Sequence, residues 1–239
     1  MSGHSKWSTI KRAKEKTDQA RGKVFTKIGR EIAVAVKLGG DDPTLNSKLY
    51  DVIQKAKANN MPNDTIQRSI KKASGGTEGA NYESILYEGY GPSGSAIMVE
   101  CLTDNKNRTA GDVRHLFEKY GAGLGTTNSV GYLFERKGVL TIEKNDKLNE
   151  EELFEIALDS GASDLVNSDD VFEIYTEKDS FHTVKKALEE KGLAFVSAEI
   201  AYVPNNCLDL DETAYEKFET LIDSLEDLDD VQNVYHNVN

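Results

Sequence analysis

The chain has 239 residues and carries 29 Lys and Arg against 41 Asp and Glu, a formal net charge of −12. This length allows two or three small domains, and no apolar run approaches the roughly 18 residues that a membrane helix needs. The basic, polar N-terminus lacks the apolar core of a secretory signal, so we expect a cytoplasmic protein with no membrane partner. The two cysteines lie far apart and show no metal-binding spacing, so we expect no metal.

Charge is divided unevenly along the chain. Residues 1–76 contain 16 Lys and Arg against seven Asp and Glu, a balance of +9, whereas the other 163 residues contain 13 against 34, a balance of −21. A segment that concentrates cations can bind phosphate even in a net-acidic protein. The pI near 4.9 is therefore an average over two regions of opposite charge.

The first third of the chain has the pattern of short helices. Apolar residues recur at helical spacing over residues 25–36, and a Gly-Gly pair ends the run. Asp42-Pro43 predicts the start of a second helix, with an apolar stripe from Leu45 onward. An Asn-Met-Pro run separates it from a third. Three short amphipathic helices bury their stripes only against one another, which predicts a small bundle.

Beyond a glycine-rich linker the apolar period changes from 3.6 to 2. Two strands are predicted around the GPSG turn at residues 91–94, followed by a helix and a strand at residues 130–134. Residues 137–203 then read strand–helix–strand–strand–helix–strand, the order of a ferredoxin-like sandwich. A last helix and strand cannot form a domain alone, so they complete a second sandwich with the earlier strands.

These elements predict an α+β protein with an N-terminal three-helix bundle and two ferredoxin-like α/β sandwiches, one inserted into the other. The inserted unit is expected to unfold cooperatively on its own. The expected domains are a basic N-terminal arm (1–22), the bundle (23–76), a discontinuous sandwich (80–136 plus 204–239) and the inserted sandwich (137–203).

No motif in the sequence predicts catalysis. A phosphate-binding GxxxxGK[ST] loop is absent. The glycines of GAGLG, at residues 121–125, follow a helix and precede a strand, the reverse of a dinucleotide fingerprint. The four histidines show no metal-binding spacing. We therefore expect no enzyme, no cofactor and no small-molecule substrate, with an enzyme of unrecognised site as the minor alternative.

Cations crowd into about 25 residues near the N-terminus, with only two acids between them. Such clustering suits phosphate, because each neutralised phosphate releases counterions; a solvated helix face is the simpler alternative. Trp7 would either stack on a base or anchor the arm. The candidate nucleic-acid-binding residues are Lys6, Trp7, Lys11, Arg12, Lys14, Arg21, Lys23, Lys27 and Arg30.

A second candidate anion site lies at residues 103–109 (TDNKNRT), between a strand and the start of a helix. Free amides at a helix N-terminus, together with two cations, suit an anion. Asn and Asp clusters also form turns and caps, which is the interpretation that we favour. The candidate residues are Asn105, Lys106, Asn107 and Arg108.

Six segments, in order along essentially the whole chain, resemble the YebC/PmpR family. They are GHSKW (3–7), GKVFTKIGREI (22–32), NNMP (59–62), YEGYGP (87–92), ECLTDNKNRT (100–109) and LFERKG (133–138). The resemblance implies a three-domain α+β fold without catalysis. The family's matching positions, as candidate nucleic-acid contacts, are Lys6, Trp7, Arg21, Lys23, Lys27 and Arg30.

The functions that the resemblance implies all require nucleic acid. Bacterial members are usually described as DNA-binding transcriptional regulators. The mitochondrial relative is a translational activator of cytochrome c oxidase, and some bacterial relatives are implicated at the ribosome. The chain departs from the family at Lys48, Tyr50 and Asn63, where arginine or lysine is common, and this weakens the expectation that the second and third helices bind phosphate.

We expect a non-enzymatic, nucleic-acid-binding regulator of gene expression, of the DNA-binding transcriptional type. The alternative is a ribosome-associated translation factor that binds RNA, because phosphate contacts look alike in both and carry no sequence information. An alternative from another class is a protein–protein adaptor whose acidic sandwiches recruit basic partners.

Overall fold

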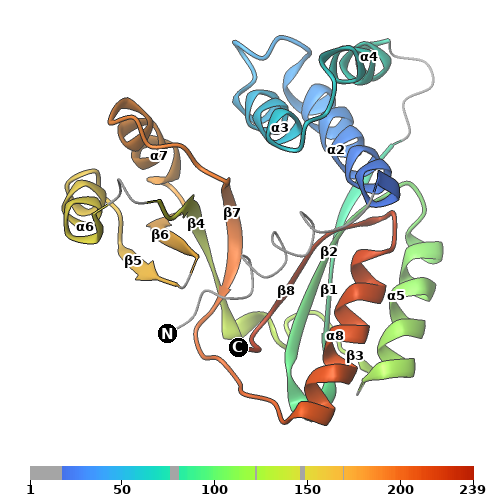
Figure 1. Ribbon diagram of the computed structural model, residues 1–239. Helices are drawn as coiled ribbons and strands as arrows, with labels where there is room; N and C mark the ends of the chain where they lie inside the picture. Colours follow the sequence, from blue (N-terminus) through green and yellow to red (C-terminus); the bar gives the residue numbers. More distant parts are fainter. Residues whose placement is uncertain (1–17, 76–80, 122, 146–148, 169) are drawn as a thin grey trace. The chain divides into compact units, whose positions relative to one another are not determined.

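The computed structural model describes residues 18–75, 81–121, 123–145, 149–168 and 170–239. Within these ranges it contains seven α-helices and two four-stranded sheets (Figure 1). The chain divides into two compact units: Gly131–Leu210 with Tyr235–Asn239 lie in one, and the other described residues in the second. The predicted α+β class, a helical region followed by two α/β parts, is confirmed, while the bounds of the four expected domains stay a prediction.

Three helices form the N-terminal bundle: α2 (Asp18–Gly39), α3 (Ser47–Ala58) and α4 (Asn63–Ser74). Each turns an apolar stripe inward because its apolar residues recur every three or four positions. The buried core consists of Ile28, Ile32, Ala35, Val36, Leu49, Val52, Ile53, Ala56, Met61, Ile66 and Ile70.

The second helix begins after, not at, the predicted Asp42-Pro43 start. Asn46 is its N-cap, and its side-chain oxygen accepts from the backbone N–H of Leu49 at 3.1 Å. The amide of the same side chain donates to two carbonyls at the end of α2, at 2.8 and 2.7 Å. This buried side chain therefore joins α2 to α3. Leu45, predicted in the apolar stripe, is 84% exposed ahead of the helix.

The unit that holds the bundle also contains an α/β sandwich. Its elements are β1 (Glu83–Tyr90), β2 (Ala96–Thr103), α5 (Lys106–Tyr120), β3 (Gly123–Leu124), α8 (Glu212–Glu226) and most of β8 (Val231–His236), whose last two residues are assigned to the other unit. The strand order is β3-β1-β2-β8. The predicted hairpin is confirmed, with Tyr90 opposite Ala96 across the turn. Figure 1 shows α5 and α8 over one face of the sheet, where Phe117 and Phe218 are buried.

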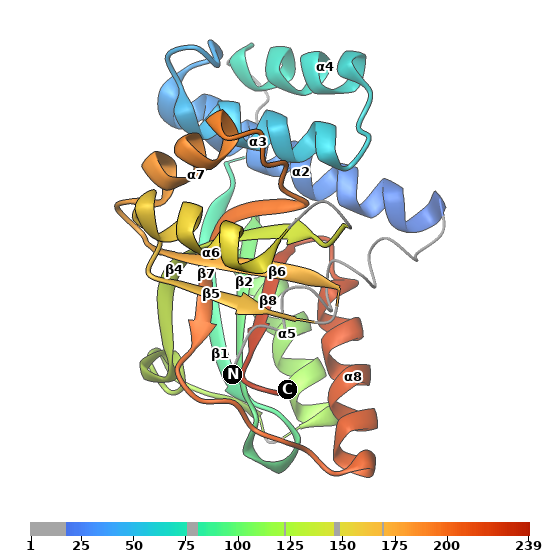
Figure 2. The same ribbon diagram turned by 60° about the vertical axis from the view of Figure 1, so that its left-hand side comes forward.

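The other unit is a ferredoxin-like sandwich. Its elements are β4 (Phe134–Glu143), α6 (Glu150–Asp159), β5 (Asp164–Asn167), β6 (Val171–Glu177), α7 (Phe181–Glu190) and β7 (Ser197–Pro204). The antiparallel strand order β5-β6-β4-β7 agrees with the predicted β-α-β-β-α-β sequence. Figure 2 shows α6 and α7 on the same face of this sheet, where Leu140, Leu153 and Leu188 form part of the core.

The strand predicted at residues 130–134 is wrong. A short 3-10 helix, Gly131–Leu133, lies there, and β4 begins only at Phe134. The carboxylate of Glu88 explains the difference, because it accepts from the backbone N–H groups of Asn128 at 2.8 Å and Val130 at 3.0 Å. Backbone amides that are bonded to a side chain are not available to a neighbouring strand.

Candidate nucleic-acid interface

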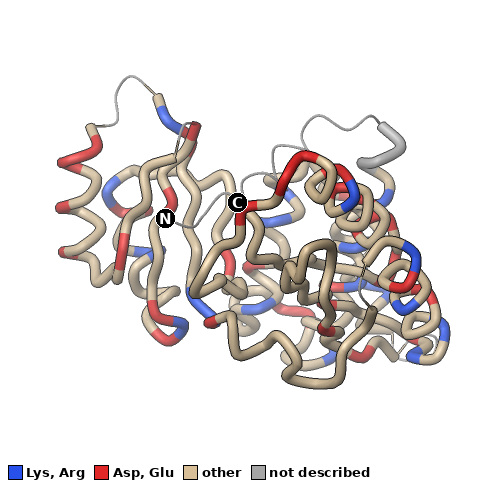
Figure 3. Tube along the Cα trace, turned by 90° about the horizontal axis from the view of Figure 1, so that it is seen from below, with Lys and Arg blue, Asp and Glu red and all other residues tan. Residues whose placement is uncertain are grey.

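The predicted basic region extends across the boundary of the described chain. Lys6, Trp7, Lys11, Arg12 and Lys14 lie outside the described residues, and the side chains that can be described on α2 begin after Arg21. The charges along the rest of the chain can be followed in Figure 3. The cations of α2 with described side chains are Lys23, Lys27, Arg30 and Lys37.

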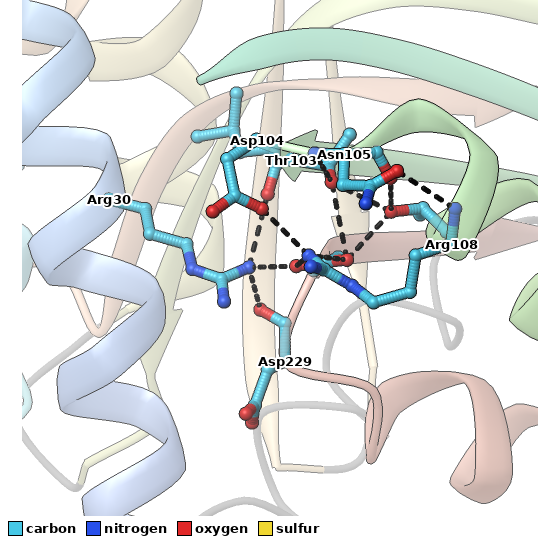
Figure 4. A network of polar contacts seen from close by, with 9 residues as sticks. Arg30, Thr103, Asp104, Asn105, Arg108 and Asp229 are labelled. Carbon is cyan, nitrogen blue, oxygen red and sulfur yellow. Dashed lines mark hydrogen bonds and ion pairs between the residues drawn. The ribbon is translucent and has the colours of Figure 1, made fainter. Parts of the chain in front are cut away.

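Arg30 points from α2 toward the segment between α8 and β8 (Figure 4). Its Nη1 donates to Asp230 Oδ1 at 2.5 Å, to the carbonyl of Asp229 at 2.7 Å and to the carbonyl of Leu102 at 3.1 Å. The guanidinium also lies over the ring of Tyr82, 5.4 Å from its centroid. With 14% of its side chain exposed, Arg30 is held by internal acceptors.

Asp230 collects donors from both the bundle and the sandwich. Besides Arg30, the Nη2 of Arg108 donates to its Oδ2 at 2.9 Å and the hydroxyl of Thr109 donates at 2.6 Å. Burial by itself raises the pKa of this carboxyl, but the hydrogen bonds from Thr109, Arg108 and Arg30 outweigh burial and hold the pKa below its ordinary value. Arg108 also reaches Asp104 at 2.8 Å. The result is a nearly buried carboxylate shared by two guanidinium groups.

The four residues predicted as a second anion site lie at the start of α5, and three of them bond to other groups of the chain. Asn105 is the N-cap of α5 and accepts from the backbone N–H of Arg108 at 3.2 Å. Lys106 forms an ion pair with Glu83, and Asn107 is exposed. The loop therefore acts as a cap, and its arginine binds carboxylates of the chain itself.

The remaining described cations of α2 also have internal acceptors. Lys27 donates to the carbonyl of Glu226 at 2.7 Å, and burial lowers its pKa to about 8 although nearby acids act in the opposite direction. Lys23 forms an ion pair with Asp227 at 3.1 Å. Lys37 donates to an asparagine side chain at 2.6 Å. All four described cations of α2 are therefore engaged by acceptors of the same unit.

A different set of cations faces solvent on the two shorter helices. The exposed members are Lys48 and Lys57 on α3 and Arg68, Lys71 and Lys72 on α4. Arg68 donates only within its own helix, to a carbonyl one turn earlier at 3.2 Å and to a threonine hydroxyl at 3.4 Å. Among the described residues, neither lysine of α4 has a hydrogen-bond or ion-pair partner. The sequence prediction missed these residues because it relied on the density of cations in the N-terminal arm. The lack of acids near the cations of α4 could have indicated that they are exposed and unpaired with carboxylates.

The described ranges contain no group of three or more His, Cys, Asp or Glu that could hold a metal ion. In the same ranges, no helix combines the length and apolar character needed to cross a membrane. Burial raises the pKa of Cys101 to about 12, so this thiol stays protonated and unreactive at neutral pH.

Comparison with known proteins identifies the relatives of the chain. Residues 5–76 match the family described as the TACO1/YebC protein N-terminal domain, and residues 82–238 match the TACO1/YebC second and third domain. A protein of Acetivibrio thermocellus named "Probable transcriptional regulatory protein" is 58% identical over 99% of this chain and 98% of its own length. A protein of the same description from Thermoanaerobacter pseudethanolicus is 54% identical over 100% and 97%.

A solved structure agrees with the fold. The crystal structure of a conserved hypothetical protein from Aquifex aeolicus has a TM-score of 0.86 and 44% identity, covering 94% of this chain and 92% of that one. The resemblance to the YebC/PmpR family is thereby confirmed. The chain belongs to the TACO1/YebC family.

Proposed function

We propose that this protein is a DNA-binding regulator of transcription that acts through phosphate contacts from its basic N-terminal third. The observation that carries the proposal is the division of charge, +9 in residues 1–76 against −21 in the remainder. The naming of the relatives as transcriptional regulatory proteins supports it.

The binding is electrostatic in origin. Cations that neutralise phosphates release condensed counterions, which gives affinity that falls steeply as salt is added. The acidic remainder repels the same polyanion, so DNA approaches the basic third alone. The arm contributes Lys6, Lys11, Arg12 and Lys14 to these contacts, with Trp7 available to stack on a base. Regulation follows from occupancy of the DNA and requires no chemical step.

The test compares two partners at matched salt. Binding of the full chain to a duplex from its own promoter and to intact ribosomes is measured between 50 and 200 mM KCl. Six phosphate contacts would weaken DNA binding about a thousandfold over this range, and Lys11→Glu with Arg12→Glu should weaken it further. A DNA affinity that does not depend on salt, or stronger binding to ribosomes than to DNA, would reject the proposal, and the second result would favour the translation factor.

A further inference from the structure

The exposed face of α4 carries cations that nothing in the described chain neutralises. Arg68, Lys71 and Lys72 are exposed, while Ile66 and Ile70 on the opposite face are buried in the bundle. Residues three and four positions apart on a helix have Cβ atoms about 5–6 Å apart. The three cations therefore form one compact positive patch, here called the α4 patch (Arg68, Lys71 and Lys72).

The α4 patch is not explained by the stability of the helix. Like charges four residues apart, as in Arg68 and Lys72, repel by a few tenths of a kcal/mol. Cations in a last helical turn gain a similar amount from the helix dipole, so the two effects nearly cancel. The one acid of the helix, Asp64, binds Arg68 through its backbone carbonyl at 3.2 Å. Charge of this kind, exposed and with no carboxylate bonded to it among the described residues, is available to an external polyanion.

The local architecture suits duplex DNA. A short turn (residues 59–62) joins α3 to α4, and Asn60 adopts a left-handed φ of 57° within it. A turn of this length also joins the two helices of DNA-binding helix-turn-helix proteins, whose second helix enters the major groove. Asn63 and Gln67 are exposed on α4 beside the cations, and their amides can pair with adenine there. The major groove of duplex RNA is too narrow for such contacts.

We propose that α4 is the helix that contacts DNA, with Arg68, Lys71 and Lys72 bound to phosphates of the duplex. This inference rests on the proposed function and deepens it, because it moves the main contact surface of the bundle from α2 to α4. Three cations of α2, Lys23, Lys27 and Arg30, are instead bonded to residues 226–230 of the same unit.

The experiment uses the full chain with Lys71→Gln and Lys72→Gln combined, titrated with a promoter duplex at several KCl concentrations. Losing two phosphate contacts should lower the slope of log affinity against log salt by about 2, and weaken binding at 50 mM KCl roughly ten- to a hundredfold. The matched control combines Lys186→Gln on α7 with Lys217→Gln on α8, which removes the same charge from exposed positions elsewhere. Thermal unfolding of both variants verifies that they are folded.

Each outcome has a distinct meaning. A lower slope for the α4 variant with an unchanged control supports the inference. An α4 variant that binds DNA like the wild type overturns the inference about α4. In that case the proposed function still stands, provided that DNA binding by the wild type depends on salt. Equal weakening of both variants overturns the inference too, since net charge alone would then be responsible. A wild type that binds ribosomes and no DNA rejects the proposed function itself, and the inference with it.

Discussion

Helices α2 and α4 are both basic and amphipathic, yet their cations have opposite environments. The four described cations of α2 all donate to acceptors within their own unit, whereas the lysines of α4 meet no partner among the described residues. The acceptors for α2 come largely from residues 226–230, about 200 positions later in the chain. Density of cations along a sequence therefore does not indicate which of them face a ligand. The acids that fold against them decide this.

The largest effect is expected when Asp230 is removed. Asp230→Ala leaves two guanidinium groups without the carboxylate that they share, and the loss of one partner from a nearly buried pair costs about 3–5 kcal/mol. Urea unfolding followed by circular dichroism measures this loss. Asp229→Ala is the control, because it removes the same charge from an exposed neighbour that accepts from Arg30 only through its backbone carbonyl. This variant should change the free energy of unfolding by less than about 0.5 kcal/mol. Equal stability of the two variants would show that Arg30 is not held through this carboxylate.

The next effect concerns the amine of Lys27 and its pH dependence. The pKa of Lys27 is about 8 in the folded chain, below the ordinary value of 10.5. Between pH 8 and pH 10.5 the unfolded chain therefore binds more protons than the folded chain. The free energy of unfolding of the wild type should consequently increase as pH rises through this range. Lys27→Met should therefore be more stable than the wild type by roughly 1–3 kcal/mol at pH 7, with the difference shrinking toward pH 10. Unfolding free energies across pH measure it.

Lys57→Met provides the comparison for that series. Lys57 is exposed at the end of α3, so its replacement should change the free energy of unfolding by less than about 0.5 kcal/mol. A difference for Lys27→Met as small as that for Lys57→Met across the pH series would mean that Lys27 is as well solvated as Lys57.

The smallest effect on stability is expected in the α4 patch. Lys71→Gln combined with Lys72→Gln removes both like-charge repulsion and a favourable dipole interaction, so stability should change by less than about 0.5 kcal/mol. Thermal unfolding at low and high salt measures it. A loss of several kcal/mol would reveal a structural role for these lysines and remove the contrast with α2.

Much of the fold follows from local sequence patterns. The period of apolar residues predicts the bundle and the β-α-β-β-α-β unit because both are built from amphipathic elements adjacent in sequence. The errors arise where one side chain satisfies a distant backbone. Asn46 fixes the start of α3 by bonding the end of α2, and Glu88 holds the backbone around Asn128 out of the sheet. Neither contact has a periodic signal.

The candidate site was less predictable for the same reason. The sequence places Arg30 and Arg108 in basic segments, but only the fold brings Asp230 between them. The exposure of Lys71 and Lys72 was predictable in principle, because α4 has one acid and places it at its first turn.

The most direct test of the contrast between the helices compares two single variants, Lys27→Met and Lys71→Gln, in one DNA titration series across KCl concentrations. We predict that Lys71→Gln lowers the slope of log affinity against log salt by about 1, while Lys27→Met leaves the slope at the wild-type value. The reverse result, a lower slope for Lys27→Met and none for Lys71→Gln, would make α2 the phosphate-binding helix and contradict the assignment to α4.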